Sequence, residues 1–381
     1  MQNSMNSIVI GADHYNTLWV IRTLGYCGFK PSVIIYSPNV SNAYVLKSRY
    51  VGNSWMVKDV ESIMNILRDE LIQGDVGKTF LFTTSDTIAE VIDKHYDELA
   101  DRYVLSNCKD GKVRLGYWMD KWNMNGIAHN VGFNIPWTKS IDLMTEDALD
   151  VSEIHFPCIL KPLKSLYGTK YDVRICHSAE EYRNVIRSMK GKCNYYIAQE
   201  YIHPDYELTI DGMRSRRADC ALFPGVILKD RTCNSTHNLG MVALAHLEKD
   251  VNKYIDPQIM QEFLRTIDYD GLCSFDLFVK DGRTYFLEVN LRTDGDMFIY
   301  TKSGINFPLL WMRLSQGIPL EPEDFKIQKE QIYGMIEFSY MKYMPWRTPW
   351  RIVSDWWKTD CYSIFSWNDI KPFFYKFIYA I

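Results

Sequence analysis

The sequence predicts a mixed fold, in which an α/β region is followed by an α+β region and an aromatic-rich carboxyl-terminal segment. Three observations support this prediction. A strand–helix–strand pattern opens the chain, a hairpin pattern with carboxylates on both arms ends near residue 290, and five of the eleven tryptophans lie between residues 346 and 367. A chain of 381 residues is long enough for two or three domains with a large buried core.

The composition is that of an ordinary globular protein, and it excludes several classes of function. Hydrophobic residues make up 47% of the chain, and the net charge of −4 without any block of Lys and Arg argues against a nucleic-acid partner. Nine scattered cysteines without Cys-x-x-Cys spacing predict reduced thiols, not a zinc site or a disulfide framework. Because neither a signal-peptide pattern nor a run of 18 apolar residues is found, we expect a cytoplasmic enzyme.

Residues 1–115 carry the α/β pattern. An apolar strand at 7–10 is followed by a helical pattern at about 16–25 and a second strand at 32–36, which together make a βαβ unit. A further strand at 79–83 continues the alternation. The first turn lacks Gly-x-Gly-x-x-Gly, so the pattern predicts a small Rossmann-like parallel sheet without a dinucleotide at that turn.

The middle of the chain has an α+β pattern that is punctuated by prolines. A strand flanked by prolines is predicted at 156–162, an amphipathic helix at 180–189 and another strand at 195–202. Asp256-Pro257 is a typical N-cap and first-turn pair, and the helix that it opens leads directly into the hairpin.

The hairpin spans residues 274–290, with a turn at Asp281-Gly282. Glu288 and Asn290 are two apart on one strand and therefore share a face. A two-residue loop would pair Asp276 with Leu287 and send Asp276 and Glu288 to opposite faces, whereas a three-residue loop with a glycine bulge shifts the register by one. We therefore expect the odd loop, with Gly282 in the left-handed region.

Three oxygen-bearing side chains on one face of this hairpin, those of Asp276, Glu288 and Asn290, suit Mg²⁺. Mg²⁺ in turn points to a nucleoside triphosphate, because it completes its shell with phosphates and water. The alternative is that the two carboxylates are solvent-facing charges on an ordinary hairpin.

Further candidate residues precede the hairpin. Lys121 follows Asp120 at the start of a predicted helix, and Lys161 ends the proline-flanked strand. The loop at 164–170 has small residues whose backbone N–H groups suit phosphate oxygens, and the pair Gln199-Glu200 interrupts an otherwise apolar strand. Alone, each of these features also fits a surface charge, a turn or a salt-bridge partner.

The order of these elements, from Asp120-Lys121 to Glu288-Val289-Asn290-Leu291-Arg292, resembles the ATP-grasp superfamily over roughly residues 115–320. Within it the chain looks most like the carboxylate-amine ligases, including D-aspartate ligase-like proteins. The resemblance implies an ATP-grasp fold with an amino-terminal Rossmann-like domain at 1–115, an ATP-grasp domain of two α+β subdomains at 116–320 and a carboxyl-terminal extension at 321–381.

The resemblance also implies a set of ATP-binding residues. They are Lys121 and Lys161 at the phosphates, Gly168 in the phosphate loop, Gln199, Glu200 and the backbone of Tyr201 and Ile202 at the adenine, and Glu207 at the ribose. The phosphate loop has a single glycine where many relatives have several, so its closure is expected to differ.

By the same resemblance Asp276, Glu288 and Asn290 hold Mg²⁺ or Mn²⁺, and Arg292 acts with Lys161 in catalysis by stabilising the phosphoryl intermediate or the substrate carboxylate. The implied reaction is attack of a carboxylate on the γ-phosphate of ATP, followed by capture of the acyl phosphate by an amine, with release of ADP and phosphate. An ATP-grasp kinase or carboxylase and a non-catalytic ATP-binding module remain as alternatives.

Two segments have no clear counterpart in the family. The polar, basic segment 229–237 is expected to help select a small acid or amine substrate, or else to be an exposed loop, and His237 in it is a weak candidate for a general base. For the aromatic tail from about residue 340 we favour packing across the protein body over docking of a partner or contact with a membrane interface. A homodimer is a separate expectation.

Overall fold

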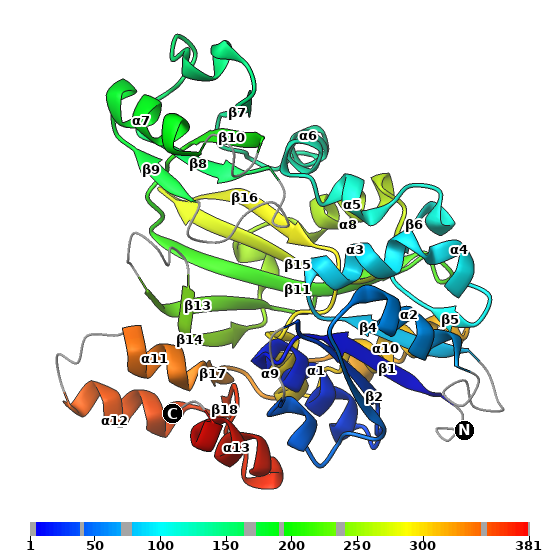
Figure 1. The fold of residues 1–381 in the computed structure, drawn as a ribbon. Coiled ribbons are helices and arrows are strands. Elements are labelled where there is room, and N and C mark those ends of the chain that lie inside the picture. Colours follow the sequence, from blue (N-terminus) through cyan, green and yellow to red (C-terminus); the bar gives the residue numbers. More distant parts are fainter. Residues whose placement is uncertain are drawn as a thin grey trace.

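The computed structural model describes residues 5–38, 42–69, 78–163, 173–189, 194–233, 241–343 and 349–379. Its strands form three sheets, of five, four and nine strands. Figure 1 shows them as a small lobe at the top, a central body and an amino-terminal layer, with the carboxyl-terminal helices along the bottom. The mixed class predicted from the sequence is confirmed.

The five-stranded sheet is parallel, in the order β3-β2-β1-β4-β5. Its strands are β1 (Ser7–Gly11), β2 (Ser32–Tyr36), β3 (Ser54–Val57), β4 (Thr79–Thr83) and β5 (Tyr103–Val104), and its main helices are α1 (Tyr15–Tyr26), α2 (Val60–Arg68) and α3 (Asp86–Lys94). The strands β1 and β4 are buried along their whole length, as uninterrupted apolar runs between helices should be. Because β1 and β2 pair in parallel and α1 lies between them in the chain, the predicted βαβ unit is confirmed.

The four-stranded sheet forms the small lobe and is antiparallel, in the order β7-β10-β8-β9. Its strands are β7 (Thr138–Asp142), β8 (Cys158–Pro162), β9 (Arg174–Cys176) and β10 (Tyr195–Glu200). Helix α7 (Ala179–Met189) packs its buried side chains against this sheet. Helices α5 (Leu115–Trp118) and α6 (Lys121–Val131) lead into the lobe, and Asp120 caps α6 by accepting hydrogen bonds from two backbone N–H groups.

The nine-stranded sheet is the centre of the molecule, in the order β16-β15-β11-β13-β14-β17-β18 with β12 and β6 attached beside it. Its long strands are β11 (Tyr206–Ser215), β13 (Val226–Cys233), β14 (Met241–Glu248), β15 (Tyr269–Lys280) and β16 (Arg283–Asn290). The shorter ones are β6 (Asn107–Cys108), β12 (Cys220–Leu222), β17 (Tyr333–Met335) and β18 (Cys361–Tyr362). Helices α8 (Pro257–Thr266), α9 (Met297–Lys302) and α10 (Phe307–Ser315) supply much of the apolar cover.

The hairpin β15–β16 corrects the predicted loop. Lys280 pairs with Arg283, so the loop has two residues, Asp281 and Gly282, both with positive φ, as a type I′ turn requires. The left-handed conformation of Gly282 is confirmed, but the three-residue loop was wrong. The register shifts instead within the strand, where Leu287 is the extra residue of a bulge between the pairs Asp276–Glu288 and Leu277–Phe286.

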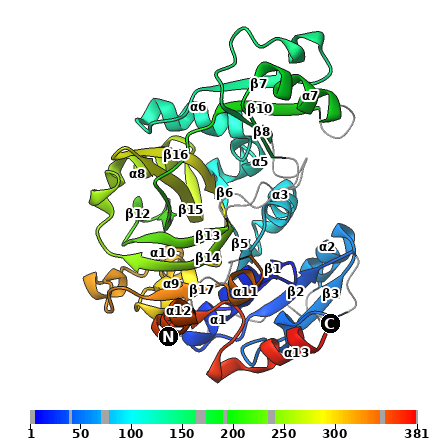
Figure 2. The same cartoon turned by 90° about the vertical axis from the view of Figure 1, so that its left-hand side faces the viewer.

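The carboxyl-terminal segment is part of the fold. Its helices α11 (Glu337–Tyr343), α12 (Pro349–Lys358) and α13 (Lys371–Tyr379) lie beside the strands β17 and β18 and the amino-terminal layer (Figures 1 and 2). The buried Glu337 carboxylate accepts hydrogen bonds from the backbone of Ser363, Ile364 and Phe365. These contacts agree with the favoured prediction that this segment packs across the body.

A buried ion pair joins the two ends of the sequence. Arg22 Nε of α1 lies 3.0 Å from Asp369 Oδ2, and the two side chains are 0% and 1% exposed. Asp369 also accepts hydrogen bonds from the Ser48 hydroxyl and the Arg49 backbone N–H. No helix among the described residues has the length and apolar character needed to cross a membrane.

Candidate active site

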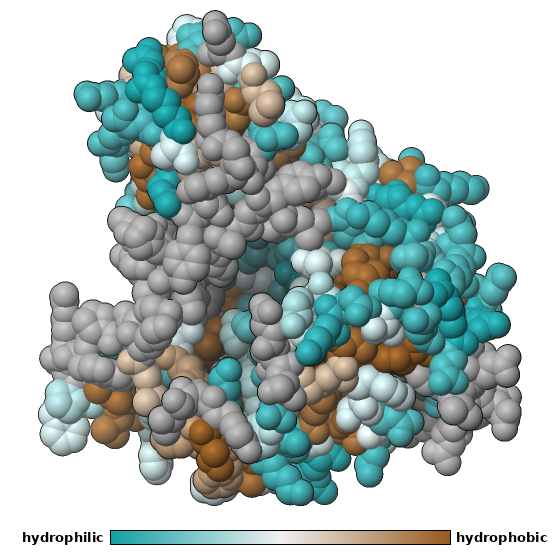
Figure 3. Space-filling view, viewed as in Figure 1, coloured by the Kyte–Doolittle hydropathy of each residue, from teal (hydrophilic) through white to brown (hydrophobic). Residues whose placement is uncertain are grey.

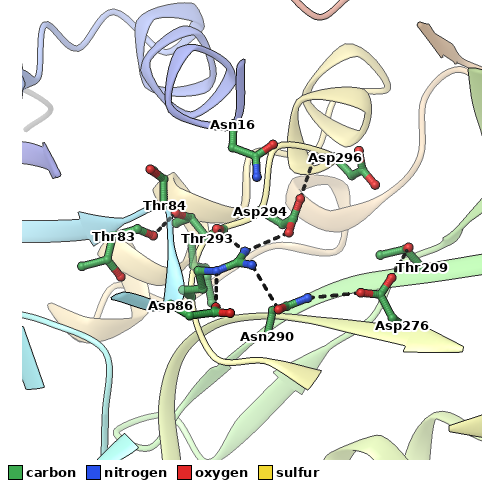
Figure 4. A network of polar contacts seen from close by, with 12 residues as sticks. Asn16, Thr83, Thr84, Asp86, Thr209, Asp276, Asn290, Thr293, Asp294 and Asp296 are labelled. Atoms are coloured by element: carbon green, nitrogen blue, oxygen red, sulfur yellow. Dashed lines mark hydrogen bonds and ion pairs between the residues drawn. The ribbon is translucent and has the colours of Figure 1, made fainter. Parts of the chain in front are cut away.

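The mid-strand bulge places the carboxylates of Asp276 and Glu288 directly opposite each other on paired strands, on the same face of the sheet. Asp276 accepts hydrogen bonds from the Thr209 hydroxyl at 2.8 Å and from Asn290 Nδ2 at 3.2 Å (Figure 4). The three predicted metal ligands are therefore together, although by a different route from the one the turn predicted.

Lysine side chains compensate both carboxylates. Lys121 Nζ, at the start of α6, lies 2.8 Å from Glu288 Oε2, and this charge holds the pKa of Glu288 at about 2. Lys229 Nζ on β13 lies 3.3 Å from Asp276 Oδ1 and 3.4 Å from Glu207 Oε2. Burial raises the pKa of Asp276, and Glu288 adds to that rise while Lys229 opposes it. A nearby cation therefore stabilises the ionised form of Asp276.

The second predicted phosphate lysine lies next to the first. Lys161 Nζ lies 3.1 Å from the side-chain oxygen of Gln199 on the neighbouring strand. Burial and the Lys121 ammonium lower the pKa of Lys161 to about 8. A nearby anion would stabilise the ammonium form of Lys161.

Arg292 connects this centre to the amino-terminal layer. Its guanidinium donates to Asp86 at 2.7 Å, to Asp294 at 2.9 Å and to Asn290 Oδ1 at 3.1 Å (Figure 4). We call these three contacts of Arg292 the clamp. Because Asp86 is the first residue of α3, the clamp fixes the end of β16 against that helix. Arg292 is held rigidly beside the carboxylate pair.

A further carboxylate lies beyond the clamp. Asp296 precedes α9, and among the described residues no hydrogen bond or ion pair to its carboxyl oxygens is found. Burial and the neighbouring Asp294 raise the pKa of Asp296 to about 7. Near neutral pH this group therefore exists in both its acid and its base form.

Several predicted residues are placed away from this centre or are not described. The Glu200 side chain at the end of β10 is exposed, and the backbone N–H of Tyr201 donates to Pro157 O at 2.9 Å. Ile202 lies on the connection between the small lobe and β11. Gly168 and His237 lie outside the described residues, and the roles of all these positions stay predictions.

Sequence reasoning missed the roles of Lys229, Asp294 and Asp296. Residues 229–233 belong to β13 and are not a loop, which the apolar run from Val226 to Leu228 could have indicated. The two aspartates continue the every-second-residue pattern of Asn290 and Arg292, and that pattern was a usable signal.

Mg²⁺ fits this donor set. The site offers two opposed carboxylates, which are hard oxygen ligands, and beside them the Asn290 amide, whose oxygen accepts a hydrogen bond from Arg292. The described residues hold no cluster of three or more His, Cys, Asp or Glu side chains that would form an all-protein metal cage. A site with few protein ligands is what Mg²⁺ uses when substrate phosphates and water complete its shell. Where described residues are visible between the small lobe and the body in Figure 3, they are mainly hydrophilic.

Comparisons with known sequences agree with this geometry. The profile of the ATP-grasp domain family matches residues 128–301. The chain is 26% identical over 211 residues to the formate-dependent phosphoribosylglycinamide formyltransferase of Wolinella succinogenes, with 53% of this chain and 52% of that protein aligned. The chain thus spans about half the length of this curated relative.

Solved structures share the fold at low identity. The N5-carboxyaminoimidazole ribonucleotide synthetase of Thermus thermophilus superimposes with a TM-score of 0.63 at 13% identity, over 86% of this chain and 82% of that one. The L-amino acid ligase of Bacillus licheniformis superimposes with a TM-score of 0.60 at 15% identity, over 86% of this chain and 78% of that one. The biotin carboxylase of Campylobacter jejuni superimposes with a TM-score of 0.65 at 14% identity, over 86% of this chain and 74% of that one. At these identities the likeness establishes the fold.

Proposed function

Because residues 128–301 match the ATP-grasp domain family, we propose that the chain is an ATP-dependent carboxylate-amine ligase that works through an acyl phosphate and releases ADP and phosphate. One observation carries this proposal: the opposed carboxylates Asp276 and Glu288 lie among four cationic side chains, those of Lys121, Lys161, Lys229 and Arg292. Phosphoryl transfer needs positioned charge more than covalent chemistry, and this arrangement supplies it.

In the proposed complex Lys121 and Lys161 bind the phosphates of ATP, and Asp276, Glu288 and Asn290 hold the metal. Mg²⁺ held by these residues would neutralise phosphate charge. Lys121 then adds a contact with a phosphate oxygen to its contact with Glu288, since one ammonium can bridge both anions. Lys229 opposes the rise in the pKa of Asp276 that burial causes.

Arg292 is proposed to orient the substrate carboxylate and to stabilise the acyl phosphate. Its Asp86 and Asp294 contacts hold the guanidinium at the edge of the metal site, so little reorganisation accompanies the reaction. The amine then attacks the acyl carbon, phosphate leaves, and the ammonium proton must pass to a base.

Asp296 is the proposed base, and this assignment predicts a pH dependence. With amine limiting, the rate should rise with pH until Asp296 is ionised, that is through about 7. Asp296→Asn should lower the rate by about 100-fold and remove this rising limb. The measurement is the pH profile of ADP release for both proteins, with Asp296→Glu as the control that retains the limb. An unchanged profile in the Asn variant contradicts the assignment.

The pKa of Lys161 predicts that the affinity for ATP falls as the pH rises. Its ammonium predominates below about pH 8 and is lost above it, so ATP affinity should fall by up to about tenfold per pH unit beyond that point. Lys161→Arg stays charged and should flatten the dependence. Calorimetric titration with Mg-ATP from pH 7 to 9.5 measures this effect. Equal slopes in the two proteins would show that Lys161 does not contact the phosphates.

The proposed function itself is tested by screening ADP release over pooled amino acids, amino sugars and small acids. A ligase releases phosphate only when acid and amine are both present, and hydroxylamine replaces the amine by trapping the acyl phosphate. If phosphate stays on the substrate, the protein is a kinase. If it binds Mg-ATP but forms no ADP with any mixture, the ligase proposal fails and a non-catalytic ATP-binding module remains.

A further inference from the structure

Helix α12 presents an unusual face to solvent. Trp350, Val353 and Trp357 recur at helical spacing on one side of it, and the two indole side chains are 83% and 90% exposed. The opposite side holds the buried Asp355. Large aromatic residues are rarely this exposed unless they contact something, so this face is a candidate contact surface.

Helix α13 repeats the arrangement. Phe374, Phe377 and Ile378 are exposed on one side, at spacings of three and four residues. Figure 1 places α12 at the lower left and α13 at the bottom, and hydrophobic atoms are visible in both places in Figure 3. We call these six residues the tail surface: Trp350, Val353, Trp357, Phe374, Phe377 and Ile378.

The inner sides of the two helices are joined by a continuous row of aromatic contacts. Trp356 of α12 packs on Tyr362 at 5.3 Å between ring centroids, Tyr362 on Phe365 at 5.7 Å, and Phe365 on Phe373 of α13 at 5.3 Å. The tail surface is therefore carried by a packed framework and is present before any partner arrives.

Ion pairs and hydrogen bonds fix the same framework to the body. The buried Asp355 accepts the hydroxyl of Tyr340 at 2.8 Å and lies 3.5 Å from Arg231 on β13. On the other side Asp369 is locked by Arg22. Both acidic groups point inward.

The charge left at the surface is positive. Arg351 on α12 and Lys371 on α13 are exposed, as are Lys47 and Arg49 next to α13. Among residues 349–378, the acids Asp355 and Asp369 are buried, and Asp360 is partly covered and paired with Lys329. An exposed apolar stripe flanked by cations and lacking exposed carboxylates is complementary to an anionic lipid surface.

We propose that the tail surface docks the protein onto an anionic membrane surface, with α12 and α13 lying in the interface plane. Tryptophan and phenylalanine then enter the headgroup region, and Arg351 and Lys371 meet lipid phosphates. A second copy of this chain fits less well, because the same cations would face each other across a symmetric contact. The proposal is independent of which substrates the enzyme joins.

Sedimentation of the full chain with sucrose-loaded vesicles tests this docking. We expect binding to vesicles of phosphatidylcholine and phosphatidylglycerol in equal parts, and much weaker binding to pure phosphatidylcholine. The double variant Trp350→Ser/Trp357→Ser should bind at least about tenfold more weakly, because it loses most of the apolar area of α12. Arg351→Glu/Lys371→Glu should lose the preference for phosphatidylglycerol.

Matched controls use exposed residues elsewhere. Met144→Ser in the small lobe and Lys249→Glu near β14 should bind as the unchanged protein does, and unfolding temperatures verify that every variant is folded. The proposal is overturned if the intact protein does not bind anionic vesicles, or if the tryptophan variant binds them equally. If the intact protein self-associates without binding vesicles, and the tryptophan variant abolishes the self-association, the tail surface contacts a second copy of the chain and the proposal is overturned.

Discussion

Replacing Glu288 by Gln is expected to slow ADP formation by about 100- to 1,000-fold at saturating substrates, the range that loss of one preorganised charge typically produces. The Lys121 ammonium holds the pKa of Glu288 at about 2, so this carboxylate is ionised at any working pH. The amide keeps the shape but removes the charge, and it weakens both the metal site and the contact that positions Lys121.

The measurement is coupled-assay ADP release, with Mg-ATP binding followed separately. Glu262→Gln on α8 is the matched control, because its side chain is exposed and remote from the site; its rate should be unchanged. Full activity of the Glu288 variant would show that the metal assignment is wrong.

Replacing Asp369 by Ala is expected to lower the free energy of unfolding by about 3–5 kcal/mol, because it leaves the Arg22 guanidinium buried without its carboxylate. The Ser48 hydroxyl and the Arg49 N–H lose their acceptor as well. For a chain of this length such a loss corresponds to a fall of roughly 4–6 °C in the unfolding temperature.

Differential scanning calorimetry measures this fall. Asp97→Ala is the control, because Asp97 pairs with Arg114 at 3.0 Å but its side chain is 83% exposed, and the change should cost less than about 1 kcal/mol. The double variant Arg22→Met/Asp369→Ala should recover part of the loss, since no charge is left buried. Equal effects of the Asp369 and Asp97 variants would mean that the buried pair is not a main stabilising contact.

The hairpin illustrates how far the sequence could be read. Asp281-Gly282 predicted a turn because local backbone preferences decide it, and the turn is there. The bulge at Leu287 was not predictable in the same way. Phe286 and Val289, three residues apart, are both buried, and the apolar run Tyr285-Phe286-Leu287 does not reveal where alternation breaks. Packing against the core, not local propensity, decides that register.

The site shows the same division. Lys121, Lys161, Asp276 and Glu288 could be proposed from their order along the chain, and the structure brings them together. The clamp on Arg292 could not be proposed from the sequence, because Asp86 is 206 positions away and resembles an ordinary residue at the start of a helix. Partners that meet only through the tertiary fold leave no local pattern in the sequence.

The pairing of Arg22 with Asp369 also sets an order of events during synthesis. The two residues are separated by 347 positions, and at ordinary elongation rates that stretch takes roughly 17–70 s to translate. Throughout this time the first helix is outside the ribosome with a guanidinium whose final partner does not yet exist. The core formed within residues 8–105 can close without Asp369, whereas the side of α1 that carries Arg22 gains its carboxylate partner only when nearly the whole chain has emerged.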